Sequence, residues 1–392
     1  MINYEKILND SIQKIAPSGI RKFFDVVATM EDAISLGVGE PDFVTPWPIR
    51  EAGIYSLEKG RTYYTANAGL MELRQEICNY TDRKYGIKYD PKTEVLVTVG
   101  GSEAIDLMIR CIVKPGDEVI IPEPSFVCYK PCTQMSGGVP VTIETLEKDN
   151  FKLTPEQLKE KITDRTKLLI LPFPNNPTGG VMSKKDLEAI AEVLKGTDIM
   201  VLSDEIYAEL RYDDEGHTPF SAIDGMRERT VVVNGFSKAF AMTGWRLGYA
   251  MGPAPIIKQM LKLHQYGIMS SPTTSQFAAI EALRSCDKET ERMRQEYNYR
   301  RRYIVDGFRA MGLSCYEPLG AFYVFPCISS LGMTSEEFAN RLLQEKKVAV
   351  VPGTAFGECG EGFIRCSYAY SIDSIEAALS RISEFVKDHK KQ

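Results

Sequence analysis

The chain has 392 residues, of which 44% are hydrophobic and 26% charged, and its formal net charge is -6. This length predicts two or three domains with a large core, and the composition is typical of a soluble globular protein. The acidic balance argues against a nucleic-acid-binding protein, which would present a basic face. No stretch approaches the roughly 20 apolar residues that a membrane-spanning helix needs. The first residues, MINYEKILND, lack the apolar run of a signal peptide.

The cysteines and histidines bear on compartment and on metal chemistry. Nine cysteines are scattered without a CxxC pair, which predicts reduced thiols and a cytoplasmic location. The three histidines, His217, His264 and His389, are far apart in the sequence. This spacing argues against a metal site, and less directly against a histidine-based catalytic triad.

Strand and helix patterns alternate through the middle of the chain. The apolar run EVLVTV (94–99) leads into GGSEAIDLMIRCIV (100–113), whose apolar residues share one helical face. A helix is also expected for SKKDLEAIAEVLKG (183–196). Further strands are expected for DEVIIPEP (117–124), KLLILPFP (167–174), DIMVLSDE (198–205) and RTVVVNGF (229–236). The alternation predicts an α/β fold with a mainly parallel sheet and helices on both faces.

The chain beyond about residue 275 has a different pattern. Residues 274–312 are charged, helical and long, AFYVFPCI (321–328) and VAVVP (348–352) predict strands, and TSEEFANRLLQEK and the C-terminal segment predict helices. A smaller α+β domain fits this pattern. We therefore predict a large domain over residues 46–284 and a small domain formed by residues 1–45 and 285–392.

Four chemically distinctive groups follow strands of the predicted sheet. Ligands of such sheets bind at the carboxyl ends of the strands, which brings Gly100-Gly101-Ser102, Asn175-Asn176, Asp204 and Lys238 to one edge. The glycine turn before a helix predicts a phosphate site, although such turns are also common structural features. Asp204 after an apolar strand predicts a carboxylate that meets a cation or a donor, or else a helix N-cap.

Lys238 and Arg246 follow the last of these strands. A lysine held at the end of an apolar strand has a lowered pKa, so that its free amine can attack a carbonyl group; a solvated lysine is the alternative. Arg246, beside Gly244 and Trp245, predicts a bidentate phosphate contact or a surface arginine. A phosphate site, a buried carboxylate and an amine nucleophile together meet the requirements of pyridoxal phosphate (PLP).

A series of motifs extends this interpretation over almost the whole chain. In order they are SLGVGEPDFVTP, YYTANAGLMELR, TVGGSEAI, PEPSFVCY, FPNNPTGG, SDEIY, NGFSKAFAMTGWRLGYAMGP, GAFYVF, VPGTAFG and GFIRCSYA. From about residue 15 onward the chain resembles the fold type I, class I/II aminotransferases, and within them the prokaryotic aspartate and aromatic aminotransferases. The resemblance implies a homodimer that binds PLP and small amino and oxo acids.

The resemblance also assigns roles around the cofactor ring. It implies that Lys238 forms the Schiff base with PLP and is the general base of the 1,3-proton shift. Asp204 would hold the ring nitrogen protonated, and Phe126 would stack on the ring. Tyr207 and Asn176 would donate hydrogen bonds to the oxygen of the ring hydroxyl.

Further roles concern the phosphate and the substrate. The residues expected to hold the phosphate are Gly101, Ser102, Ser237 and Arg246, with Tyr64 reaching the phosphate of the neighbouring subunit. Arg365 would bind the α-carboxylate of the substrate bidentately, helped by the backbone of Gly39 and by Asn176. The bonds Glu123-Pro124 and Asn176-Pro177 match positions where the family has cis peptides.

Two departures from the family pattern bear on phosphate binding and specificity. Gly235 stands where many members have a phosphate-binding serine, which places more weight on Ser237. Ser102 stands where some aspartate-specific members have a basic residue, so a strict preference for acidic side chains is in doubt. Phe126 and the segment SGIRKFFD (18–25) resemble members that accept aromatic substrates.

The expected reaction is a ping-pong transfer of an amino group from an aromatic or dicarboxylic L-amino acid, such as aspartate, to 2-oxoglutarate. A PLP-dependent β-lyase on the same fold would keep every cofactor residue and differ only in its products. A cofactor-sensing regulator would carry a DNA-binding module before this fold, where only about 15 residues are found. A purely structural role leaves the lysine, the aspartate and the arginines unexplained.

Overall fold

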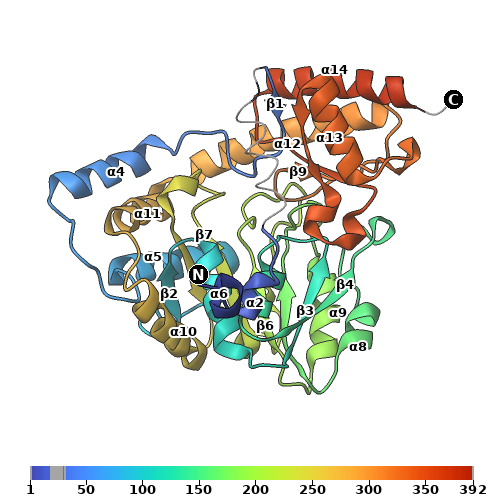
Figure 1. Cartoon of the computed structure of the whole chain (residues 1–392). Helices are drawn as coiled ribbons and strands as arrows, with labels where there is room; N and C mark the ends of the chain where they lie inside the picture. The colour runs from blue at the N-terminus through green and yellow to red at the C-terminus, as the bar shows by residue number, and fades with distance from the viewer. Residues whose placement is uncertain (1, 18–29, 31, 391–392) are drawn as a thin grey trace.

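A seven-stranded sheet in the order β2-β8-β7-β6-β5-β3-β4 forms the centre of the molecule (Figure 1). The computed structural model describes residues 2–17, 30 and 32–390. The strands of the sheet are β2 (Val95–Thr98), β3 (Glu118–Glu123), β4 (Val139–Glu144), β5 (Thr166–Leu171), β6 (Met200–Asp204), β7 (Thr230–Gly235) and β8 (Gly248–Met251). Neighbouring strands are parallel, except that β8 runs antiparallel to β2 and β7. The predicted α/β fold is therefore confirmed.

The sheet is stable because its apolar residues are buried on both faces. Val95 and Val97 of β2 pack in one cluster with helices α5 and α11, whereas Leu96 packs in another with α6 and α10. Successive side chains of a strand point to opposite faces, so all of β2 is buried. The helices that cover the sheet are α5 (Met71–Tyr85), α6 (Gly101–Ile112), α7 (Tyr129–Met135), α8 (Pro155–Lys161), α9 (Lys184–Leu194), α10 (Ala254–Gly267) and α11 (Thr273–Ser285).

The C-terminal elements form a second core above the sheet, in the orange and red part of Figure 1. Helices α12 (Asp287–Ala310), α13 (Ser335–Lys346) and α14 (Ile372–His389) pack there against a small antiparallel sheet in the order β11-β12-β9. Its strands are β9 (Tyr323–Val324), β11 (Val351–Pro352) and β12 (Ile364–Ser367). The N-terminal strand β1 (Ile34–Ser35) pairs in parallel with β10 (Val348–Ala349).

The helical stretch 274–312 is divided into α11 and α12 at Cys286. Cys286 is buried with the helices beside the sheet, while Met293 and Tyr297 of α12 belong to the C-terminal core. The chain thus leaves one core and enters the other within two helical turns. The predicted division into residues 46–284 and residues 1–45 with 285–392 stays a prediction.

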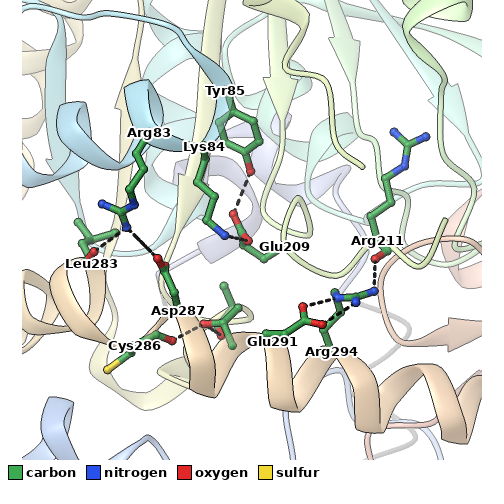
Figure 2. Close-up of polar contacts among 12 residues, drawn as sticks. Arg83, Lys84, Tyr85, Glu209, Arg211, Leu283, Cys286, Asp287, Glu291 and Arg294 are labelled. Carbon is green, nitrogen blue, oxygen red and sulfur yellow. Dashed lines mark hydrogen bonds and ion pairs between the residues drawn. The ribbon is translucent and has the colours of Figure 1, made fainter. Parts of the chain in front are cut away.

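Polar contacts join the end of α5 to the beginning of α12 and to the segment after β6 (Figure 2). Arg83 lies 3.2 Å from Asp287, and Lys84 lies 3.1 Å from Glu209. Tyr85 donates to the same Glu209 carboxylate at 2.9 Å. Because Glu209 closely follows β6, these contacts brace the backbone that carries Asp204 and Tyr207.

The remaining described elements are helix α4 (Trp47–Glu58), whose Ile49 packs in the cluster with α5 and α11, and several shorter helices. The shorter ones are helices α1 (Tyr4–Ile7) and α2 (Asp10–Gln13), and 3-10 helices at Glu147–Asp149, Phe220–Ala222, Arg227–Arg229, Thr243–Trp245, Ser329–Leu331, Gly353–Phe356 and Glu358–Gly360. The segment SGIRKFFD lies outside the described residues. Among the helices of the described part, none is long and apolar enough to cross a membrane.

Candidate functional site

A cavity of about 360 Å³ opens at the carboxyl ends of the sheet strands. It collects side chains from segments that are far apart in the sequence. The predicted site residues that line it are Gly39, Gly101, Ser102, Phe126, Asn176, Asp204, Tyr207, Ser237, Lys238, Arg246 and Arg365. Tyr64 does not line this cavity, and 77% of its surface is exposed.

Lys238 reaches the cavity from the turn after β7. Val231, Val232 and Val233 bury that strand in the core, so the chain emerges at the cavity floor. The Lys238 amine donates to the backbone oxygen of Gly39 at 2.6 Å. Burial, together with the charge of Arg365, lowers the pKa of Lys238 to about 8. Near neutral pH, far more of this amine is therefore uncharged and nucleophilic than at the ordinary pKa of a lysine.

Asp204 is the last residue of β6 and is buried at the cavity wall. Its Oδ2 accepts a hydrogen bond of 2.7 Å from the Tyr129 hydroxyl, and its Oδ1 accepts one of 3.2 Å from the backbone of Ile206. Burial raises the pKa of Asp204 to about 6, although the Tyr129 hydrogen bond opposes the rise. Since a turn and not a helix follows Asp204, the helix N-cap interpretation is wrong.

Two tyrosine hydroxyls meet beside the cavity. The hydroxyls of Tyr207 and Tyr323 lie 2.9 Å apart, and both side chains are buried. Burial raises the pKa of Tyr207 well above its usual value, so this phenol is a hydrogen-bond donor at physiological pH.

Arg365 of β12 is 2% exposed and lies over the faces of two aromatic rings. Its guanidinium carbon is 4.5 Å from the centre of the Tyr323 ring and 4.8 Å from that of Phe356. Nη1 donates to Asn176 Oδ1 at 2.9 Å, and Nη2 donates to the backbone oxygen of Gly37. Nε has no hydrogen-bond partner within the described chain. A buried guanidinium with an unused donor suits the binding of a carboxylate.

The turn before α6 forms an anion-binding end of the cavity. Gly100 has a φ of 77°, and a Cβ at this position would lie 2.5 Å from Nη2 of Arg246. Only a glycine lets the guanidinium approach the turn this closely. The free backbone N–H groups at the start of α6 and the Arg246 charge therefore favour a bound anion.

Close backbone packing explains why a glycine stands at position 235. A Cβ at Gly235 would lie 2.9 Å from the Cα of Gly248, which is closer than carbon atoms can approach without a shift. No serine fits there while the two strands keep this separation. Ser237, two residues on, is buried and lines the cavity.

Among the cavity residues that the sequence interpretation missed are two tyrosines, Tyr129 and Tyr323. Both occur within motifs quoted above, PEPSFVCY and GAFYVF. A tyrosine three residues after Phe126 was a usable signal, because such spacing lets both rings reach one site. The ring centres of Phe126 and Tyr129 lie 6.0 Å apart in an edge-to-face arrangement.

Two further expectations concern peptide bonds and metals. Glu123-Pro124 and Asn176-Pro177 are cis, as expected, and so is Phe173-Pro174. Among residues 2–17, 30 and 32–390, no group of three or more His, Cys, Asp or Glu side chains is placed to hold a metal ion.

Comparisons with known proteins give a consistent result. The family described as "Aminotransferase class I and II" matches residues 31–382. The YugH protein of Bacillus subtilis (strain 168) is 54% identical, and the match covers 97% of this chain and 98% of that protein. Aromatic-amino-acid aminotransferase 2 of Thermococcus litoralis is 42% identical over 98% of this chain and 99% of its own. The solved structure of aspartate aminotransferase from Thermus thermophilus with maleate has a TM-score of 0.92 at 39% identity, covering 96% and 99% of the two chains.

Proposed function

Because this chain belongs to the class I and II aminotransferases, we propose that it transfers the amino group of an L-amino acid to 2-oxoglutarate with PLP as cofactor. Membership confirms the resemblance seen in the motifs and makes the protein an aminotransferase. The observation that carries the proposal is the half-buried Lys238, which shares one cavity with Asp204 and Arg365. We propose a ping-pong order, in which the donor leaves as an oxo acid before the acceptor binds.

The cavity fits PLP at three points. The amine of Lys238, with a pKa of about 8, is available for covalent attachment. Asp204 offers a buried carboxylate for a protonated ring nitrogen, and Arg246 with the turn at Gly100 offers donors for a phosphate. PLP supplies an electron sink for the carbanion that amino-group transfer requires.

The side chains of the cavity divide the remaining work. Arg365 would bind the α-carboxylate of the substrate and orient its Cα hydrogen toward Lys238. Nζ of Lys238 would accept that proton and then give it back as the general base of the 1,3-proton shift. The Tyr207 hydroxyl, held by Tyr323, would donate to the ring hydroxyl oxygen of the cofactor, together with the Asn176 amide. Ser102, Ser237 and Gly101 would complete the phosphate site.

We propose that the amino donors include aromatic and dicarboxylic amino acids. The names of the Thermococcus and Thermus proteins support these two classes. Phe126 on the cavity wall and the uncharged Ser102 support the aromatic class. With 2-oxoglutarate as acceptor, we expect phenylalanine, tyrosine and aspartate all to yield glutamate, measured by amino acid analysis against a Lys238→Ala blank. Activity with aspartate alone would contradict the aromatic half of the proposal.

The products also separate transfer from β-elimination. A β-lyase releases pyruvate and ammonia without any oxo-acid acceptor, whereas a transaminase makes a new amino acid only when the acceptor is present. The three relatives described above all bear aminotransferase names, so we do not favour a β-lyase.

We propose that the active unit is a homodimer in which Tyr64 completes the partner's phosphate site. Exposed apolar side chains on α4 (Trp47, Tyr55, Leu57), beside Tyr64 (Tyr63) and on α10 (Tyr266) support an interface. Thr273 donates to the backbone oxygen of Tyr63 at 2.6 Å, and Asn67 donates to that of Met269 at 2.8 Å. These bonds hold the Tyr64 loop rigidly, as presentation to a second subunit requires.

The cytoplasmic location stays a prediction.

Hybrid dimers test this sharing directly. Mixing inactive Lys238→Ala subunits with impaired Tyr64→Phe subunits should restore activity above that of either parent. The hybrid then contains one site with both an intact lysine and an intact Tyr64. If hybrids form, as shown by two affinity tags, and no activity returns, Tyr64 serves its own chain or no site.

A further inference from the structure

A buried histidine lies directly behind the anion-binding turn. His264 is on α10, which packs beside α6 (Figure 1), and its side chain is fully buried. Its Nδ1 lies 2.7 Å from Oε1 of Glu103, the third residue of α6. None of the functions proposed so far uses this pair.

The other oxygen of Glu103 closes the turn itself. Glu103 Oε2 accepts a hydrogen bond of 2.5 Å from the backbone N–H of Val99. Val99 precedes Gly100, and Glu103 follows Ser102, so the carboxylate spans the whole turn that faces the proposed phosphate. The backbone N–H groups of this turn can bind an anion only if they keep their direction.

The charge of Glu103 makes its position important. A carboxylate in the first turn of a helix competes with any other anion for the same N–H groups and the same end of the helix dipole. Val99 and His264 each bind one of its oxygens, which fixes the carboxylate at the back of the turn. Without His264, one oxygen would be free to turn toward the cavity and repel a phosphate.

The second ring nitrogen of His264, Nε2, indicates that the role of this residue is its contact with Glu103. Nε2 is buried and has no hydrogen-bond partner within the part of the chain that the structure describes. An apolar residue would fill this space without an unsatisfied buried nitrogen, which is unfavourable. Because Nδ1 faces a carboxylate, it carries the proton and donates.

We propose that His264 is a positioning residue for the phosphate of the cofactor, acting through Glu103 on the turn from Val99 to Ser102. This inference rests on the proposed function, since it presupposes PLP in the cavity. It assigns His264 no contact with the cofactor and no role in proton transfer. Its signature is therefore selective: weaker binding of PLP, with unchanged binding of a ring that has no phosphate.

Two amide substitutions make a matched pair for the test. The Nδ2 of an asparagine occupies nearly the place of histidine Nδ1, so His264→Asn should keep the hydrogen bond to Glu103. The longer His264→Gln places its amide near Nε2 and should lose that bond. His264→Leu removes it altogether. Met260→Ala, a change of another fully buried residue on α10, controls for lost packing.

The measurement compares PLP with pyridoxal, which lacks the phosphate, by equilibrium dialysis of the full chain, with thermal melting to confirm folding. In His264→Gln and His264→Leu we expect the Kd for PLP to rise about tenfold, the loss of one charge-assisted hydrogen bond, with the Kd for pyridoxal unchanged. His264→Asn and Met260→Ala should keep the ratio of the two constants seen in the original protein.

Two other results have distinct meanings. Equal losses for PLP and pyridoxal in His264→Gln, or no loss for PLP, would overturn the positioning role and leave the proposed function intact. If the original protein binds neither compound, the proposed cofactor is wrong, and the role of His264 falls with it.

Discussion

Replacing Lys238 by alanine is expected to lower turnover about 10⁴-fold with every amino donor, because the change removes both the attachment point and the general base. The variant should still bind the cofactor without a covalent bond, since Asp204, Arg246 and the turn at Gly100 remain. Burial lowers the pKa of Lys238 to about 8, which favours reaction of its amine near neutral pH.

The covalent link can be located directly. Borohydride reduction of the holoenzyme followed by peptide mapping should find the label on Lys238. Lys258 and Lys262 on α10 are the comparison residues, because both are exposed and lie outside the cavity. A label on either of them would refute the assignment, and Lys258→Ala should behave like the original protein.

Replacing Asp204 by alanine is expected to give the second largest effect, a loss in kcat of about 10²–10³-fold. Without a carboxylate the ring nitrogen loses its proton, and the developing carbanion is less stabilised in the transition state. Asp204→Glu restores the charge at a slightly different position and should retain far more activity than the alanine variant. Both variants should be compared by kcat and by the visible absorbance of the bound cofactor.

The Asp204 prediction also has a clear negative outcome. Turnover near the original level in Asp204→Ala would rule out a role for this carboxylate in stabilising the cofactor ring. Tyr129 controls the charge of this carboxylate, because its hydroxyl donates to Asp204 at 2.7 Å and opposes the rise in the Asp204 pKa. A buried carboxylate with one such donor removed binds its proton more tightly.

Much of the fold could be predicted because it depends on local patterns. The run of valines at 231–233 favours a buried strand through its own residues, and the strand–helix alternation admits few sheet arrangements. Strands β4 and β8 were not among those predicted. The antiparallel direction of β8 could not be predicted either, because a strand's direction depends on the path of the loops that connect it. The break at Cys286 also escaped prediction, since the helical pattern continues through it and only the change of core ends the first helix.

Local sequence was enough to place Lys238 and Asp204 after buried strands and a glycine turn before α6. Each of these features depends on residues within a few positions of one another. Tertiary structure alone decided which of them meet. Arg365 binds Asn176 across 189 residues, Tyr207 meets Tyr323 across 116, and His264 reaches Glu103 across 161. Such contacts depend on the packing of whole elements, because a hydrogen bond requires atoms placed to within a few tenths of an ångström. No local pattern along the chain specifies positions that closely.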